Sequence, residues 1–204
     1  AVDVIDEAGQ PVEGGMGELA CRAPWPGITR GVWNDPDRYL KTYWSKVSGV
    51  WVHGDWASRD SDGFWYLHGR SDDTLNIAGK RIGPAEFESI AVALPGVAGA
   101  AAVGIPDVVK GETVVLCVVA TGVGPPDLRE QVSAAVVGEL GKAFKPNAVH
   151  LVDDLPRTRS AKTVRRAVRA ALLGHDPGDL STLENPESLR GLAQIRLPQE
   201  ESPG

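Results

Sequence analysis

The chain has 204 residues, of which 42% are hydrophobic, and its formal net charge is −6 at pH 7. A surface that binds nucleic acid needs clustered Lys and Arg against the phosphates, so this acidic balance argues against nucleic acid as a partner. No apolar stretch approaches the roughly 20 residues that span a bilayer, so we expect no membrane partner either.

Cysteine and histidine usage gives no indication of a metal site. The two cysteines, Cys21 and Cys117, are far apart and lack metal-ligand spacing, and the four histidines do not cluster. We expect two free thiols, which are typical of a reducing compartment. Together with the lack of a recognisable signal peptide, this favours a cytoplasmic location.

The composition changes near residue 70, which predicts two differently built cores. All six tryptophans and all three tyrosines precede this point, whereas the later part is rich in Ala and Val. We expect a β-rich domain at 1–70, a hinge segment at 71–73, an α/β domain at 74–174 and a tail at 175–204. The tail is rich in Pro, Gly and acidic residues, so it is predicted to be loosely ordered.

The first domain is predicted to consist mainly of short strands and turns. Strands are expected at 2–5, 17–21, 49–53 and 64–67, where apolar residues lie between turn residues. Asp35 and Pro36 predict the start of a short helix, because Asp caps helix N-termini and Pro fits the first helical position.

The second domain is predicted to alternate strands with helices. Strands are expected at 74–77, 80–82, 97–103, 113–120 and 148–152. Helices are expected at 84–94, 127–140 and 163–173. Interleaved elements of this kind indicate the α/β (α+β) fold class.

Lys162 breaks a local rule. It is predicted at the start of the last helix, where the positive end of the helix dipole disfavours a cation by about 0.3–1 kcal/mol. A rule broken without structural gain marks a candidate functional site, and a lysine suits a phosphate or carboxylate oxygen. A solvated lysine on a basic helix start explains the same residue, so the spacing alone leaves both interpretations open.

A second group of candidate residues lies between residues 53 and 88. Asp55 follows a predicted strand, where a carboxylate can accept two hydrogen bonds of the kind that a ribose diol offers. Turn chemistry explains Asp55 equally well, capping explains Asp72 and Asp73, and a positive φ explains Gly79. Each of these features is weak when it is taken alone.

Taken in order, these motifs resemble the C-terminal motif series of the adenylate-forming enzymes, which include acyl-CoA synthetases, peptide-synthetase adenylation domains and firefly luciferase. The series consists of Gly54-Asp55, Asp62-Gly63-Phe64, Gly69-Arg70-Ser71-Asp72-Asp73, Gly79-Lys80-Arg81-Ile82, Glu86-Phe87-Glu88 and Pro156-Arg157-Thr158-Arg159-Ser160-Ala161-Lys162. The resemblance covers about 2–187, and the segments 72–77 and 178–186 look most like acetyl- and propionyl-CoA synthetases. It implies the β-rich end of a large N-terminal domain, followed by a small mobile C-terminal α/β domain.

The resemblance implies nucleotide-binding roles for three residues. Asp55 would bind the ribose hydroxyls of ATP or AMP, and Arg70 would act at the same ribose or its phosphate. Arg81 would approach the adenylate phosphate in a second conformation of the enzyme.

The resemblance also implies a moving part. Asp72 would be the hinge, and Lys162 would be the catalytic residue that bridges phosphate and carboxylate oxygens during adenylation. Gly79 would line the passage for the pantetheine of CoA after the domain has turned.

The implied reaction converts a carboxylate, ATP and CoA into acyl-CoA, AMP and pyrophosphate, with acetate or propionate as the expected short-chain acid. The implied partners are these substrates, the N-terminal domain of the same enzyme, and a lysine acyltransferase acting on Lys162. The chain contains no phosphate loop, and Mg²⁺ would be bound mainly by the missing N-terminal part. We therefore expect the parent protein to be an AMP-forming acid-thiol ligase and the chain alone to be inactive.

Several positions depart from the family pattern or carry only weak assignments. Ala161 stands where the family usually has Gly, and His53 stands where it usually has Ser or Thr. If position 161 needs a positive φ, the Ala Cβ would cost about 1 kcal/mol or more. Candidates for the contact with the CoA 3′-phosphate are surface lysines: Lys110, Lys142 and Lys145.

Two alternatives stay open from the sequence. The first is a standalone non-catalytic module that binds CoA or a partner, which Ala161 and the missing phosphate loop favour. The second is an adenylation domain that loads a carrier protein, against which the segment 181–186 counts.

Overall fold

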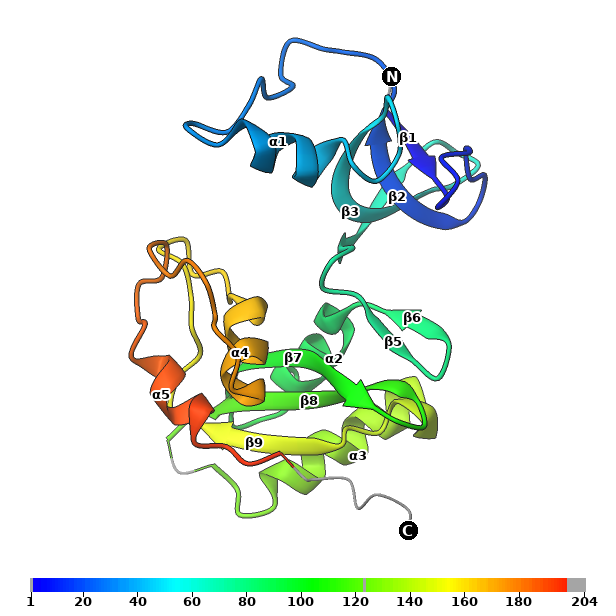
Figure 1. The fold of residues 1–204 in the computed structure, drawn as a ribbon. Coiled ribbons are helices and arrows are strands. Elements are labelled where there is room, and N and C mark those ends of the chain that lie inside the picture. The colour runs from blue at the N-terminus through cyan, green and yellow to red at the C-terminus, as the bar shows by residue number, and fades with distance from the viewer. Residues whose placement is uncertain (1, 123, 198–204) are drawn as a thin grey trace. The chain divides into compact units, whose positions relative to one another are not determined.

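The computed structural model describes residues 2–122 and 124–197 and divides into two compact units, Ala1–Asp72 and Asp73–Gly204 (Figure 1). Each unit has its own sheet and its own buried core. The predicted α/β fold class, with strands and helices interleaved in the second part of the chain, is confirmed.

The first unit contains a four-stranded antiparallel sheet in the order β1-β2-β3-β4. Its strands are β1 (Val2–Ile5), β2 (Met16–Cys21), β3 (Trp51–Arg59) and β4 (Trp65–Arg70). β3 continues well beyond the predicted end at residue 53. Gly54, at φ +86°, and a register shift after Trp56 let the strand bend without ending.

Helix α1 (Pro36–Tyr43) begins where the sequence predicts. The Arg38 amide donates to the Asp35 side chain at 3.0 Å, and Pro36 occupies the first turn. The cap satisfies one of the amides that a helix start leaves without an intrahelical partner.

The second unit contains a five-stranded sheet around β8 (Gly111–Ala120). Its other strands are β5 (Leu75–Ile77), β6 (Lys80–Ile82), β7 (Val97–Asp107) and β9 (Ala148–Val152). β7 pairs antiparallel with β8, β9 pairs parallel with it, and the β5–β6 hairpin joins β8 at Gly111.

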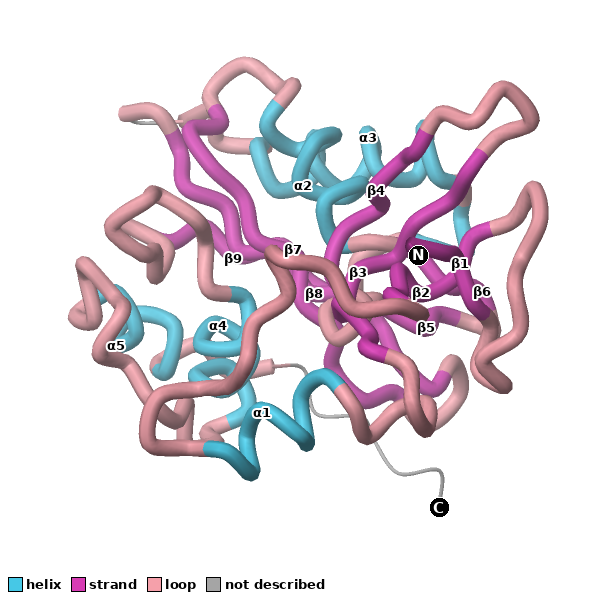
Figure 2. Tube along the Cα trace, turned by 90° about the horizontal axis from the view of Figure 1, so that it is seen from above, coloured by secondary structure: helices cyan, strands magenta, loops and turns pink. Residues whose placement is uncertain are grey.

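Helices cover both faces of this second sheet (Figures 1 and 2). α2 (Pro84–Val92), α3 (Leu128–Leu140) and the short 3-10 helix η1 (Lys142–Phe144) lie on one face. α4 (Arg165–Leu173) and α5 (Ser188–Ala193) lie on the other.

β8 shows why its sequence is a continuous apolar run. Leu116 points into the core beneath α2 and α3, whereas its neighbours Val115 and Cys117 point into the core beneath α4 and α5. Successive residues of a strand face opposite sides of the sheet, so a strand covered on both faces is apolar throughout. The same burial raises the pKa of the Cys117 thiol to about 12.

The segment from His175, predicted to be loosely ordered, is instead part of the fold as far as Leu197. It contains α5, and Leu183, Leu189 and Leu192 are buried in the core beside α4. The Pro, Gly and acidic content predicts loose order, but the spaced leucines give this segment an apolar face that packs into the core. The end of the predicted tail, 198–204, lies outside the described residues.

The packing of α5 predicts a large effect of a single truncation. Leu192→Ala should lower the free energy of unfolding by about 2–5 kcal/mol, because Leu192 is 0% exposed and its truncation leaves a cavity. Urea denaturation measures the change. Arg190→Ala, on the exposed side of the same helix, should stay within about 0.5 kcal/mol of the parent chain. Equal stability of Leu192→Ala and Arg190→Ala would contradict the observed packing.

Candidate functional site

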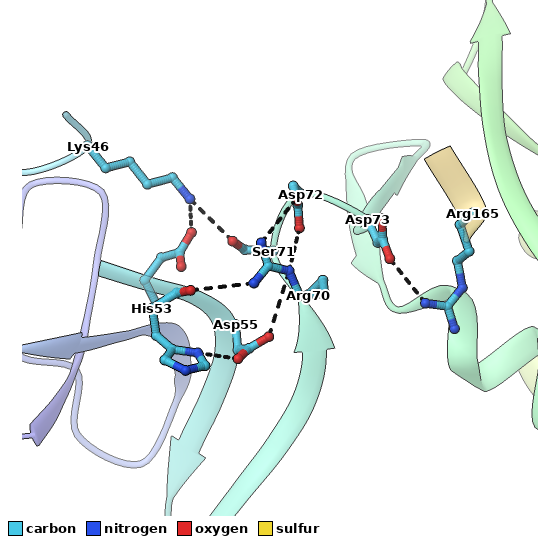
Figure 3. A network of polar contacts seen from close by, with 9 residues as sticks. Lys46, His53, Asp55, Arg70, Ser71, Asp72, Asp73 and Arg165 are labelled. Atoms are coloured by element: carbon cyan, nitrogen blue, oxygen red, sulfur yellow. Dashed lines mark hydrogen bonds and ion pairs between the residues drawn. The ribbon is translucent and has the colours of Figure 1, made fainter. Parts of the chain in front are cut away.

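A polar network lies where β3 and β4 of the first unit adjoin (Figure 3). Asp55 on β3 and Arg70 at the end of β4 are direct partners in the antiparallel register. The pairing brings Arg70 Nε to 4.0 Å from Asp55 Oδ1. Residues 15 positions apart in sequence thus meet through the sheet.

The Asp55 carboxylate is held from two sides. His53 Nδ1 contacts Asp55 Oδ2, while Arg70 flanks Oδ1. The Asp55 side chain is 18% exposed, so it is oriented by its neighbours without being sealed from solvent. A carboxylate fixed in this way can accept hydrogen bonds from neighbouring hydroxyl groups.

Arg70 also fixes Asp72. Its Nε and Nη2 donate to the two Asp72 carboxylate oxygens at 2.9 and 3.2 Å, and its Nη1 donates to the His53 carbonyl at 3.5 Å. Partial burial alone would raise the pKa of Asp72, but the hydrogen bonds and charge of Arg70 outweigh it and hold that pKa below its usual range. Asp72 is therefore ionised at neutral pH and bound to the first unit.

Gly54 leaves the space that Arg70 occupies. A Cβ added at position 54 would lie 3.1–3.3 Å from the guanidinium atoms of Arg70, and the φ of +86° also favours glycine. The Gly54-Asp55 motif therefore has a structural reason in the approach of this arginine.

Asp73 is fixed by a different arginine, in the second unit (Figure 3). Arg165, the first residue of α4, donates to Asp73 Oδ2 at 3.0 Å and to both oxygens of Glu88 on α2 at 2.7 and 2.6 Å. Glu88 Oε1 also accepts a hydrogen bond from the Ala102 amide of β7 at 3.0 Å. We call Asp73, Glu88 and Arg165 the arginine clamp.

The arginine clamp explains a cation at a helix start. The hydrogen bonds of Glu88, followed by its charge and by Asp73, outweigh burial and raise the pKa of Arg165 above its ordinary value. These two carboxylates offset the unfavourable helix dipole at this position. The clamp connects α4, α2, β7 and the residue that follows Asp72.

The β5–β6 hairpin presents Gly79 at its turn. Ala78 and Gly79 have φ values of +50° and +76°, the positive signs that a type I′ hairpin turn requires. The Ala78 amide donates to the Lys110 carbonyl at 3.1 Å. Among the described residues, none lies within 4 Å of a Cβ built on Gly79, and Arg81 is exposed on β6.

Lys162 lies in a narrow loop at 156–164, which we call the lysine loop. The Thr158 amide donates to the Lys162 carbonyl at 2.9 Å, and the Val164 amide donates to the Pro156 carbonyl at 2.8 Å. These bonds pair the two arms of the loop and leave the Lys162 side chain exposed.

Lys162 is not at the start of a helix, in contrast to the prediction. α4 begins at Arg165, because the paired arms of the lysine loop keep residues 163 and 164 out of the helix. The helix-dipole reasoning therefore applies to Arg165 and not to Lys162. Ala161 adopts φ +61°, so the position where the family usually has Gly does require the left-handed conformation.

The predicted site residues fall into three groups. Within the first unit, Arg70 contacts both Asp55 and Asp72. Gly79 and Arg81 share one hairpin, and Lys162 lies on a separate loop. Figure 1 shows the lysine loop and the β5–β6 hairpin well apart within the second unit.

Sequence reasoning missed the arginine clamp. Arg165 and Glu88 are 77 positions apart, and nothing local indicates that they pair. The available signal was an arginine at the start of an amphipathic helix, where a cation needs an anionic partner.

Comparison with known proteins finds the class that this geometry resembles. Residues 86–162 match the family described as the AMP-binding enzyme C-terminal domain. The predicted resemblance to the adenylate-forming enzymes is thereby confirmed.

The chain is similar to acetyl-coenzyme A synthetases within this class. It is 43% identical over 191 residues to the enzyme of Pyrobaculum arsenaticum, and 43% identical over 203 residues to that of Methanothrix soehngenii. These alignments cover 92% and 95% of the chain but only 28% and 30% of the relatives, so the chain spans less than a third of their length. In structure it is similar to acetoacetyl-CoA synthetase from Streptomyces lividans, with a TM-score of 0.83 and 28% identity over 95% of the chain and 30% of that protein.

The described residues, 2–122 and 124–197, contain neither a candidate membrane-spanning helix nor a cluster of metal ligands. No helix in this part of the chain is long and apolar enough to cross a membrane. The same residues contain no group of three or more His, Cys, Asp or Glu side chains that could hold a metal ion.

The left-handed Ala161 predicts a stabilising substitution. Ala161→Gly should raise the free energy of unfolding by about 0.5–1 kcal/mol, because the removed strain exceeds the entropy that Gly adds to the unfolded chain. Urea denaturation measures the difference. Ala170→Gly, within α4, is the matched control and should lower stability by about 0.5–1 kcal/mol. A loss of stability in Ala161→Gly would show that the loop is not strained there.

The arginine clamp predicts a strong dependence on Arg165. Arg165→Met should lower the free energy of unfolding by about 3 kcal/mol, because Glu88 and Asp73, whose side chains are 14% and 25% exposed, lose their cation. Adding Glu88→Met should recover part of the loss, since it removes one unpaired charge. Urea denaturation of Arg165→Met, Glu88→Met and the double variant measures the coupling between the two side chains. If the two single effects simply add in the double variant, the coupling is contradicted.

Proposed function

We propose that this chain is the C-terminal, moving part of an AMP-forming acyl-CoA ligase that acts on a short-chain acid, with acetate favoured. The observation that carries the proposal is the 43% identity to acetyl-coenzyme A synthetases over more than nine tenths of the chain. The ligase would form an acyl adenylate from a carboxylate and ATP, releasing pyrophosphate. It would then transfer the acyl group to CoA, releasing AMP.

Asp55 and Arg70 would hold the nucleotide. The Asp55 carboxylate is oriented by His53 and Arg70 yet remains partly exposed, which suits hydrogen bonds from the 2′- and 3′-hydroxyls of ribose. Arg70 would place its positive charge beside the same nucleotide, where it favours phosphate. The ATP-bound MatB from Rhodopseudomonas palustris, 29% identical with a TM-score of 0.70, supports an ATP-dependent reaction.

Lys162 would act in the first half-reaction. A carboxylate oxygen attacks the α-phosphorus of ATP, the bond to the bridging oxygen breaks, and pyrophosphate leaves. Two anions must approach each other, and a lysine positioned between them stabilises the charge that develops. The exposed side chain of Lys162 on a narrow, paired loop suits a residue that enters the site and leaves again.

The hinge would lie at Asp72, in the φ and ψ dihedrals on either side of its peptide bond to Asp73. Asp72 is bound to Arg70 of the first unit, while Asp73 is bound to Arg165 of the second. Two neighbouring residues anchored to different bodies concentrate rotation in the few backbone dihedrals between them. The arginine clamp would carry this rotation to α4, and so to the lysine loop directly before it.

The second half-reaction would use a different face of the moving domain. The CoA thiol loses its proton and attacks the acyl carbon, and AMP leaves. Gly79 has open space around it and would let pantetheine pass, while Arg81 on the same hairpin would approach the AMP phosphate. The separation of this hairpin from the lysine loop supports domain rotation between the two steps.

Further assignments follow from the same proposal. Lys110, Lys142 and Lys145 remain candidates for the CoA 3′-phosphate, and Lys162 remains a candidate substrate of a lysine acyltransferase, which would neutralise its charge. The N-terminal domain of the same cytoplasmic enzyme would supply the phosphate loop and acyl pocket. The same N-terminal domain would also bind most of the Mg²⁺ that accompanies ATP.

The proposal predicts that Lys162 serves only one half-reaction. In the ligase that contains this chain, Lys162→Ala should lower acetate-dependent ATP–pyrophosphate exchange by about 10²–10³-fold, the usual effect of losing one charge-stabilising group. Formation of acetyl-CoA from supplied acetyl-AMP should stay within about twofold, because no phosphate–carboxylate approach remains to be stabilised.

Arg129→Ala is the control for removal of an exposed cation elsewhere in the same domain, and it should leave the exchange reaction unchanged. Equal loss of both half-reactions in Lys162→Ala would contradict the assigned role. Absence of acetate-dependent exchange in the unmodified ligase, with other short-chain acids also inactive, would contradict the proposed function itself.

A further inference from the structure

The segment after α4 returns to the lysine loop. Residues 183–185, which we call the bracing segment, lie beside the first arm of that loop. The Glu184 amide donates to the Arg157 carbonyl at 2.9 Å, and Leu183 and Thr158 form an antiparallel bridge. The bracing segment thus occupies the free edge of the arm.

The opposite edge of the same arm is paired within the lysine loop. Arg157 forms an antiparallel bridge with Thr163, and the Thr158 amide donates to the Lys162 carbonyl. Three short backbone stretches therefore lie side by side, with the arm at 157–158 in the middle. A central stretch paired on both edges is held more firmly than a two-stranded loop, which is marginal in water.

Asn185 locks this arrangement through its side chain. Its Oδ1 accepts a hydrogen bond from the Arg157 amide at 2.9 Å. Its Nδ2 donates to Asp154 Oδ2 at 2.7 Å and to the Leu155 carbonyl at 2.9 Å. Asn185 is only 5% exposed, so its own amide depends on these bonds because water cannot readily reach it.

Asp154 connects Asn185 to Arg157 a second time. Its Oδ1 accepts from Arg157 Nη1 at 2.7 Å, while its Oδ2 accepts from Asn185. Burial alone would raise the pKa of Asp154, but the Leu155 amide, Asn185 and Arg157 together hold it below its usual range. The base of the lysine loop is therefore a polar network in which Asp154 is ionised at neutral pH.

The bracing segment is itself anchored in the core. Leu183 precedes Asn185 and is buried, and Leu189 and Leu192 of α5 pack into the same cluster as α4. An anchored segment that bonds to a protruding loop restricts where the loop tip can lie. The polar contacts go to residues 154–158, and so act on Lys162 through the backbone.

We propose that the bracing segment is a positioning element for Lys162, with Asn185 as its central positioning residue. The inference rests on the proposed function, since it requires Lys162 to act in adenylation. Its function would be to hold the loop tip so that the ammonium reaches the reacting oxygens in one defined place. This gives a purpose to the segment 178–186, whose sequence resembles acetyl- and propionyl-CoA synthetases and which the hinge and nucleotide assignments leave without a role.

The test separates positioning from stability in the ligase that contains this chain. Asn185→Ala should lower the rate of acetate-dependent ATP–pyrophosphate exchange by about 10–100-fold, the range expected when a catalytic group is displaced by about 1 Å. The KM for acetate should change by less than about threefold. Acetyl-CoA formation from supplied acetyl-AMP should stay within about twofold.

Two further variants keep the test decisive. Glu187→Ala changes an exposed residue of the same tail and should match the unmodified enzyme in both half-reactions. Asn185→Asp keeps the acceptor for the Arg157 amide, but it loses both N–H donors and places a second carboxylate against Asp154. It should therefore also lower ATP–pyrophosphate exchange while sparing acetyl-CoA formation from acetyl-AMP. Amide hydrogen exchange of the folded variants should show faster exchange at 157–162 in Asn185→Ala, with the β8 amides unchanged.

Three outcomes would overturn the inference. The first is an unchanged rate of ATP–pyrophosphate exchange in Asn185→Ala. The second is an equal loss of both half-reactions in Asn185→Ala and Asn185→Asp. The third is an unchanged rate of amide hydrogen exchange in the lysine loop of Asn185→Ala. If instead Lys162→Ala also leaves exchange activity intact, the failure lies in the proposed function and not in the bracing segment.

Discussion

The arginine clamp is the interaction on which the arrangement of the second unit depends. Arg165 binds the first residue of the unit, a helix on one face of the sheet and, through Glu88, the backbone of β7. Its own helix lies on the opposite face. The Arg165 side chain therefore connects the helices on both faces of the sheet to Asp73, the first residue of the second unit. Hydrogen bonds between charged groups are stronger than those between neutral groups, so they fix the position of Asp73 relative to α4.

Much of the fold could be predicted from the sequence because local patterns determine it. The strand at 148–152 and the start of α1 at Pro36 are as predicted, and the ends of α2, α3 and α4 lie within two residues of their predicted positions. The errors have physical causes. The end of β3 was misplaced because Gly54 permits a bend within the strand, and the tail was misjudged because spaced leucines outweigh its polar content.

The candidate site divides in the same way. Motif order pointed to Asp55, Arg70 and Asp72, and in the structure both carboxylates contact Arg70. The contacts of Arg165 with Glu88 and of Asn185 with Asp154 join residues 77 and 31 positions apart, and only the folded chain brings them together. Single-sequence reasoning therefore finds the residues of a motif more readily than the residues that hold the motif in place.

The buried thiol of Cys117 has a practical consequence for studies of this protein. A pKa of about 12 leaves roughly one thiol in 10⁵ ionised at pH 7, and the thiolate is the reactive species. Cys21 is also buried, and burial raises its pKa as well. Thiol-reactive dyes that follow the consumption of free CoA should therefore receive little background from the cysteines of the folded chain. Label uptake at Cys117 would instead report loss of the core around β8.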